Sequence, residues 1–151
     1  GGGIPNLQLL SAFCKKHSAS FCQEIKTKKL PVISAEDKRI KSFVIADPLN
    51  LFPENGFYNI SAPVQLWVSE LGGEGVTPES MASIYQSSQT SENQFVKGAG
   101  HFAFLSPCTE QQKLTAPVIC TDHADFDREK FHQYFNKELI RFFSFTLGKP
   151  K

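Results

Sequence analysis

The chain has 151 residues, of which 40% are hydrophobic and 21% charged, a composition typical of a globular protein with one core. Its 16 lysines and arginines nearly balance its 15 aspartates and glutamates, so the chain has no strong positive electrostatic potential to attract nucleic acid or an anionic membrane. No apolar run approaches the roughly 20 residues that a membrane-spanning helix needs. We therefore expect residues 1–151 to form a single domain or part of one, without a nucleic-acid partner or a membrane span.

The first predicted element is a helix that begins at about Pro5, since proline is tolerated in the first turn of a helix. Residues 40–46 and 63–69 are rich in β-branched and aromatic side chains and are predicted strands. After the second strand, Thr77 can cap a helix that starts at Pro78. Residues 94–97 are predicted to form a third short strand.

A loop with two cysteines is expected next, followed by a last helix. Asp127 can cap that helix, and Phe126 can pack against Phe131. The helix has an apolar stripe, which must pack against a large apolar surface of the protein. Its members are Phe131, Tyr134, Phe135, Leu139, Phe142 and Phe143. Strands that alternate with helices predict an α/β fold with a parallel sheet and helices on both faces, and three strands predict part of a larger sheet.

The four cysteines fall into two local pairs, Cys14 with Cys22 and Cys108 with Cys120. No C-x-x-C unit and no neighbouring histidine pair accompanies them, so short disulfide-closed loops are favoured over zinc. The alternative is four buried free thiols. Disulfides would favour an oxidising compartment, hence a periplasmic or secreted protein.

His101 is the candidate catalytic histidine. It follows the third predicted strand and two glycines, Gly98 and Gly100, which let the chain turn off the sheet at the strand's carboxyl end. A histidine in this position can also be purely structural. His123 and His132, by contrast, are expected at the surface, and the flanking Phe102 and Phe104 can line an acyl pocket or pack in the core.

Glu74 is the preferred catalytic acid. It lies in a glycine-rich turn between the second strand and a helix, and the order acid then histidine is that of α/β-hydrolases. Such a carboxylate orients the histidine and stabilises its protonated form. Glu70 in the same turn is an alternative. So is Asp47, after the first strand, although aspartate followed by proline is also typical of a strand terminator.

The nucleophile of such an enzyme lies in a G-x-S-x-G turn before the acid, and no serine or cysteine of this chain has glycines at that spacing. Gly1, Gly2 and Gly3 precede the first predicted helix, where the last glycines of such a turn would fall. We expect the nucleophile upstream of Gly1. Alternatively, the three glycines are a linker or a cloning remnant.

Residues from 40 to the last helix resemble bacterial proteins named predicted dienelactone hydrolases, which are similar to the platelet-activating-factor acetylhydrolases. The resemblance rests on LGGEGVTP at 71–78, GAGHFAFL at 98–105, PC at 107–108 and ICTD at 119–122. It implies the C-terminal half of an α/β-hydrolase, with a serine nucleophile followed by a glycine pair, which Gly2 and Gly3 fit. The acid of that family is usually aspartate, so Glu74 would be a departure, although other α/β-hydrolases use glutamate.

The sequence therefore predicts a serine-dependent hydrolase of carboxylic esters, with His101 and Glu74 in this chain and no metal or cofactor. Its partners would be a small ester substrate and the N-terminal half of the domain, or a partner chain that completes the sheet. The alternative is a binding or structural module that keeps the fold and lacks the nucleophile, since fold alone does not determine function.

Overall fold

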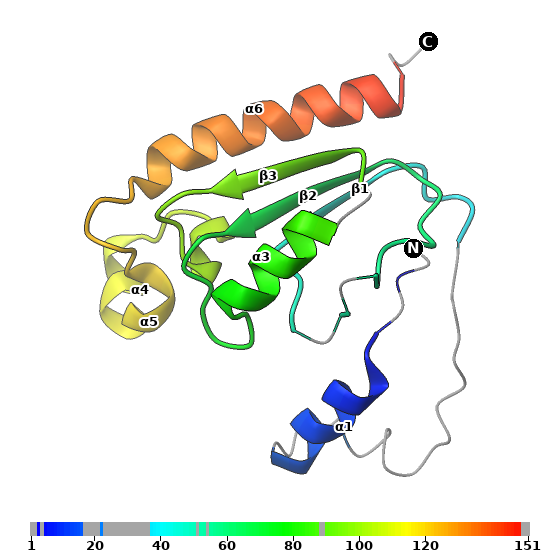
Figure 1. Ribbon diagram of the computed structural model, residues 1–151. Helices are drawn as coiled ribbons and strands as arrows, with labels where there is room; N and C mark the ends of the chain where they lie inside the picture. The colour runs from blue at the N-terminus through cyan, green and yellow to red at the C-terminus, as the bar shows by residue number, and fades with distance from the viewer. Residues whose placement is uncertain are drawn as a thin grey trace.

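The computed structural model describes residues 3, 5–16, 22, 37–50, 52–53, 55–87 and 90–148. Figure 1 shows the arrangement of the elements within these residues. In chain order they are α1 (Leu7–Lys16), β1 (Phe43–Ala46), β2 (Val64–Ser69), α3 (Pro78–Ser87), β3 (Glu92–Val96), the 3-10 helix η1 (His101–Phe104), α4 (Glu110–Thr115), α5 (Pro117–Cys120) and α6 (Arg128–Thr146).

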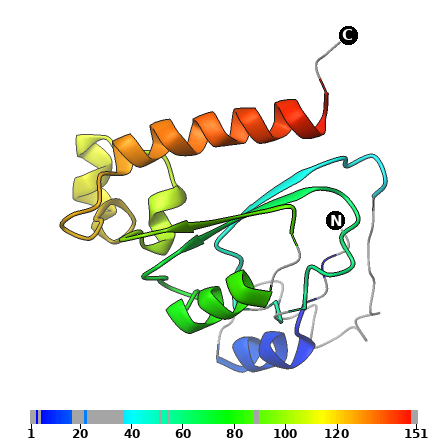
Figure 2. The ribbon, with the colours of Figure 1, turned by 45° about the horizontal axis from the view of Figure 1, so that its top comes forward.

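The strands of the described residues form one parallel sheet in the order β1-β2-β3, so the expected α/β class is confirmed. β2 is central, and all six of its residues are buried. Because neighbouring side chains of a strand point to opposite faces, Leu66 and Val68 lie on one face and Trp67 on the other. Their buried partners are Met81 and Ile84 of α3 on the first face, and Phe131 and Phe135 of α6 on the second. Helices thus cover both faces, as Figure 2 shows from a second angle.

The local signals for the helices are confirmed. The side chain of Asp127 accepts a hydrogen bond from the Lys130 amide at 2.9 Å and caps α6. The rings of Phe126 and Phe131 lie 5.5 Å apart, as expected for a hydrophobic contact across the start of this helix. The Thr77 hydroxyl caps α3 by accepting from the Ser80 amide at 3.2 Å.

Some expectations were wrong in detail. The third strand, expected at residues 94–97, spans Glu92–Val96, and the first helix, expected from about Pro5, begins at Leu7. Pairing of the first strand with β2 begins at Phe43 rather than at residue 40. The Ile40 amide instead donates to the Asp37 carbonyl in a turn, so it is not free to bond a neighbouring strand. The segment between the second pair of cysteines is not a plain loop, since it holds α4 and α5. Its signals are a capping box between Thr109 and Gln112, and a proline in the first turn of α5.

Both expected disulfides are present. The sulfur atoms of Cys14 and Cys22 lie 2.09 Å apart, and those of Cys108 and Cys120 lie 2.10 Å apart. Disulfides of this kind are compatible with an oxidising compartment. Within the described ranges no helix has the length and apolar character needed to cross a membrane.

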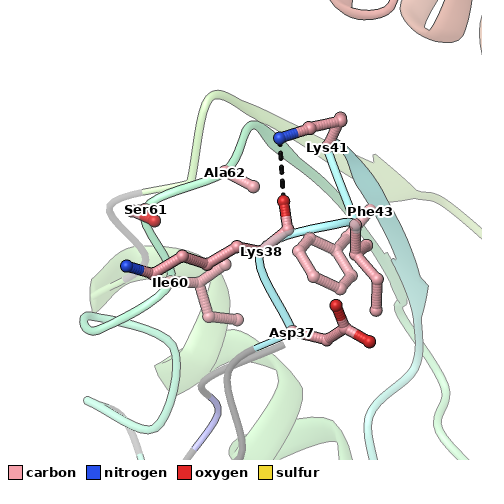
Figure 3. A pocket seen from close by; sticks show the side chains of 8 residues that line it. Asp37, Lys38, Lys41, Phe43, Ile60, Ser61 and Ala62 are labelled. Carbon is pink, nitrogen blue, oxygen red and sulfur yellow. Dashed lines mark hydrogen bonds between the residues drawn. The ribbon is translucent and has the colours of Figure 1, made fainter.

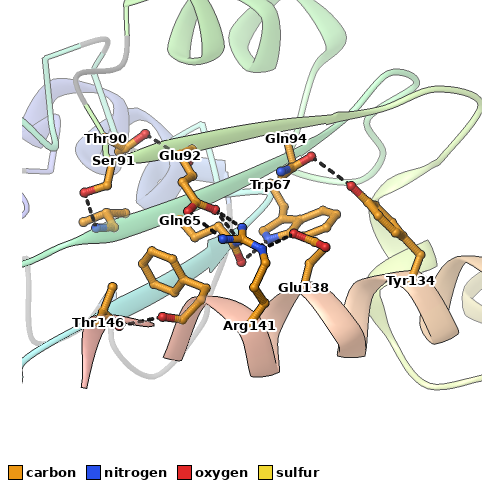
Figure 4. A network of polar contacts seen from close by, with 12 residues as sticks. Gln65, Trp67, Thr90, Ser91, Glu92, Gln94, Tyr134, Glu138, Arg141 and Thr146 are labelled. Atoms are coloured by element: carbon orange, nitrogen blue, oxygen red, sulfur yellow. Dashed lines mark hydrogen bonds and ion pairs between the residues drawn. The ribbon is translucent and has the colours of Figure 1, made fainter. Parts of the chain in front are cut away.

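A chain of polar contacts ties α6 to the sheet (Figure 4). Two guanidinium nitrogens of Arg141 donate to the carboxylate of Glu92 at the start of β3. The same carboxylate accepts from the Gln65 amide at 2.9 Å, and Gln65 accepts from the Trp67 indole at 2.8 Å. The hydrogen bond from Arg141 is the main cause that holds the pKa of Glu92 below its ordinary value, partly offset by burial. The ion pair therefore favours the folded state with Glu92 ionised.

We expect Glu92→Gln to lower the Tm by about 1–3 °C at neutral pH, because a half-exposed ion pair stabilises only modestly. Since folding lowers the pKa of Glu92, this stabilisation is fully present above the carboxyl's ordinary pKa and is lost as the pH falls through the folded-state pKa. The difference in Tm between variant and wild type should thus shrink as the pH falls below the carboxyl's ordinary pKa and close below the folded-state pKa. Thermal melts at a series of pH values from neutral to acid measure it. Glu110→Gln, which removes the exposed pair with Lys113, is the control and should not change the Tm. A difference that persists in acid would contradict the assignment.

Candidate active site

His101 lies at the carboxyl end of β3, where the chain leaves the sheet. Gly98 makes the turn with φ 73°, a left-handed conformation that favours glycine. Its amide donates to the Glu70 carboxylate at 2.7 Å. His101 follows as the first residue of η1. The expected position at the edge of the sheet is therefore the observed one.

The glycine-rich turn after β2 forms the surface on which His101 rests. The His101 amide donates to the Gly72 carbonyl at 2.6 Å. A Cβ atom on Gly73 would lie only 2.8 Å from the Cβ of His101, closer than real Cβ contacts. Gly72 itself has φ 63°, and a Cβ there would meet the Val76 carbonyl at 2.4 Å. These glycines allow two loops to touch backbone to backbone.

The imidazole of His101 is joined to Asp47, which follows β1. Its Nδ1 lies 3.2 Å from Asp47 Oδ2. The side chain of Asp47 is fully buried, whereas that of His101 is 22% exposed. The pair thus has one end in the interior and the other accessible from outside.

Ser69, the last residue of β2, holds the Asp47 carboxylate in place. Its amide donates to Oδ1 at 2.6 Å, and its hydroxyl donates to Oδ2. Asp47 has φ 42°, a left-handed conformation that a residue other than glycine adopts at a cost of about 1–3 kcal/mol. Its amide donates to the Trp67 carbonyl at 2.9 Å. Strained residues of this kind concentrate at functional sites.

This arrangement has a definite chemical capacity. A carboxylate that accepts the Nδ1 proton leaves Nε2 of the imidazole as the basic nitrogen and stabilises the imidazolium formed when Nε2 takes up a proton. Asp47 and His101 therefore have the geometry of a general base with its orienting acid. A nucleophile would complete the set.

The geometry does not support Glu74 as the acid partner of His101. Glu74 is exposed, and no hydrogen bond joins it to another of the described residues. Glu70 is turned to the Gly98 amide and supports the turn before His101. Asp47, the alternative after the first strand, is the carboxylate that contacts the imidazole. Asp47 also directly follows the last residue of β1, as expected of a residue that terminates a strand.

Ser69 was not among the residues predicted for the site. A signal for it exists, because each strand is followed or ended by a polar residue, Asp47 for β1, Ser69 for β2 and His101 after β3. The carboxyl ends of parallel strands meet at one edge of a sheet, where open α/β sheets hold their sites. The register that pairs Ala46 with Trp67 then brings Asp47 and Ser69 together.

A pocket of about 290 Å³ opens over His101. One side consists of the turn at residues 71–74, and the other of residues 118 and 121–123. Phe102 also lines it, whereas Phe104 packs in the core with Trp67. Glu74 therefore lies at the pocket, although it does not bind the imidazole.

A second pocket, of about 320 Å³, lies at the opposite end of the sheet (Figure 3). It is lined by residues that precede or begin β1 and β2, among them Asp37, Lys41, Phe43 and Ile60. The amino ends of the strands are not where open parallel sheets bind reacting groups. We assign this pocket no part in the chemistry of His101.

The other two histidines differ from each other. His123 is exposed, as expected, and lines the pocket over His101. His132 is half-buried rather than a plain surface residue, and its Nε2 lies 2.9 Å from the Ala103 carbonyl of η1. It therefore connects α6 to the short helix that carries His101.

Gly1 and Gly2, expected next to the nucleophile, lie outside the described residues. Within the described residues no group of three or more histidine, cysteine or acidic side chains is placed to hold a metal ion. Comparison with known proteins found no matching family model, no matching curated protein and no matching solved structure. Interpretation of the site therefore rests on its own geometry.

We expect Gly73→Ala to reduce the free energy of unfolding by about 1–2 kcal/mol, because the new Cβ forces His101 away from the turn. Gly100→Ala is the matched control. Its Cβ would have an ordinary contact of 3.4 Å, and φ of −91° suits any residue, so stability should hold or rise slightly. Urea unfolding of both variants measures the difference. Equal stability of the two would show that His101 does not depend on close contact with Gly73.

Proposed function

We propose that this chain is the C-terminal part of an α/β-hydrolase that cleaves carboxylic esters, with Asp47 as the acid and His101 as the histidine of a Ser-His-acid triad. The observation that carries the proposal is the contact between a buried, strained carboxylate and a partly exposed imidazole at the carboxyl edge of a parallel sheet. This geometry suits a base that removes a proton from a hydroxyl group.

The order of the residues supports this function. In α/β-hydrolases the nucleophile comes first, then the acid and then the histidine, each on a loop after its strand. Asp47 follows β1 and His101 follows β3, with β2 between them in the sheet. The nucleophile, a serine, would then come from a segment that precedes this chain in the full-length protein. Aspartate as the acid also agrees with the family that the sequence resembles.

Each group has a defined part in the proposed reaction. The serine oxygen attacks the ester carbonyl while Nε2 of His101 takes the hydroxyl proton. The imidazolium then gives this proton to the departing alcohol, and water removes the acyl group by the same steps. Asp47 keeps the Nδ1 proton in place and stabilises the imidazolium. Ser69 holds the Asp47 carboxylate by two hydrogen bonds and does not take part itself.

The proposed location is the periplasm or the exterior of the cell. Its support is the pair of disulfides, since such bonds persist in oxidising compartments and are rare in the cytosol.

The test uses the full-length protein and two measurements, turnover of p-nitrophenyl butyrate and labelling by a fluorophosphonate, which reacts with activated serines. We expect His101→Ala and Asp47→Asn each to reduce kcat by about 10⁴-fold and to suppress labelling. The double variant should be scarcely worse than His101→Ala, because the two residues act as a unit.

Glu74→Gln is the matched control for the acid. It removes a carboxylate that lies at the same pocket, and it should leave kcat within about threefold of wild type. If Glu74→Gln abolishes turnover while Asp47→Asn does not, the acid is misassigned. If the wild-type protein neither turns over the ester nor takes the label, the hydrolase proposal fails and a non-catalytic module is favoured.

A further inference from the structure

The pocket over His101 has a wall that is built separately from the sheet. Val118, Thr121, Asp122 and His123 form this wall, which we call the outer wall, opposite the glycine turn at residues 71–74. In Figure 1 the helices that lead to it, α4 and α5, lie beside the start of α6. The short α4 and α5 have no buried residues. Core packing therefore does not explain how the outer wall keeps its position.

The Cys108–Cys120 disulfide is the first tie. It closes the segment that contains α4 and α5, and its second cysteine stands directly before Thr121. The amide of Thr121 donates to the Pro117 carbonyl at 2.9 Å. Because the bridge ends next to the outer wall, it restricts where residues 121–123 can lie.

Arg128 is the second tie, and it comes from a different element. Its Nε and Nη2 each donate to the Asp122 carboxylate at 2.7 Å, and its Nη1 donates to the Ile119 carbonyl at 3.0 Å. The residue is only 6% exposed. Two parallel bonds from one guanidinium to one carboxylate specify orientation as well as distance.

Arg128 also connects the outer wall to the core. It is the first residue of α6, three residues before Phe131, which packs on Trp67 of the central strand. The same strand ends at Ser69, which holds the catalytic carboxylate. The outer wall and the Asp47–His101 pair are thus both connected to the central strand of the sheet.

We propose that the outer wall is a substrate-binding surface and that Arg128 is its positioning residue, acting together with the Cys108–Cys120 disulfide. The inference rests on the proposed ester hydrolysis. Arg128 touches no reacting atom in this role. Its guanidinium sets where Val118 and residues 121–123 stand relative to His101, and so sets how well an ester is held while the serine reacts.

The test compares variants of the full-length protein with p-nitrophenyl butyrate as substrate. Arg128→Met keeps most of the aliphatic part of the side chain and removes the guanidinium. We expect it to raise KM about tenfold while kcat changes less than about threefold, because binding of the ground state and of the transition state is weakened together. Arg128→Lys keeps the charge and should have a smaller effect. Replacing Cys108 and Cys120 by serine should raise KM in the same way. Because both ties hold one wall, combining the two changes should raise KM by less than the product of the separate effects.

The other disulfide gives a matched control. Cys14 and Cys22 are buried and do not line the pocket, so replacing both by serine should leave KM unchanged. Hydrogen exchange of residues 117–123 is a second readout that needs no turnover. It should speed up in the Arg128→Met protein and in the Cys108 and Cys120 variant, while exchange in β2 stays slow.

The outcomes separate the two proposals. A wild-type protein without turnover or labelling would defeat the hydrolase function alone, and hydrogen exchange would still decide whether Arg128 fixes the outer wall. With turnover present, an unchanged KM in the Arg128 and Cys108–Cys120 variants would overturn the inference. So would exchange at residues 117–123 that matches the wild type. Should Arg128→Met fail to fold, the Arg128→Lys and cysteine variants carry the same test.

Discussion

The buried carboxylate of Asp47 is the feature on which the site depends. A carboxylate withdrawn from water is costly unless its oxygens accept hydrogen bonds. Here the Ser69 amide donates to Oδ1, the Ser69 hydroxyl donates to Oδ2, and Nδ1 of His101 lies 3.2 Å from the same Oδ2. These contacts connect the ends of β1 and β2 with the turn after β3. One buried charge therefore specifies the relative position of three loops.

The close contact of these loops needs residues without side chains. Gly73 lets the His101 backbone approach the turn after β2, and Gly72 accepts the His101 amide proton. Gly72 and Gly73 thus allow the close approach of His101, whereas Glu74, the next residue, is exposed. The sheet under these loops is held rigid because α3 and α6 pack on the two faces of its central strand. The regular, well-packed sheet therefore keeps the irregular loops in position.

The proposed function is supported by the site and not by the fold, since one fold can serve many activities. The strained Asp47, its burial and its contact with a partly exposed imidazole are the observations that support the proposed role of this pair. The pocket above adds a place for a small ligand, with the outer wall held by Arg128 and a disulfide. Both halves of the pocket are attached to the same sheet.

The sequence alone determined what depends on neighbouring residues. Caps at Thr77 and Asp127, the three strands with α1, α3 and α6 in their order, both cysteine pairs and the position of His101 at a strand end followed from local signals and were confirmed. Which carboxylate contacts His101 was decided only by tertiary structure. It depends on the register of β1 against β2 and on the left-handed backbone at Asp47, and neither leaves a trace in local spacing. Glu74 is nearer to His101 along the chain, but the hydrogen bond forms across the sheet, where parallel strands bring distant residues together.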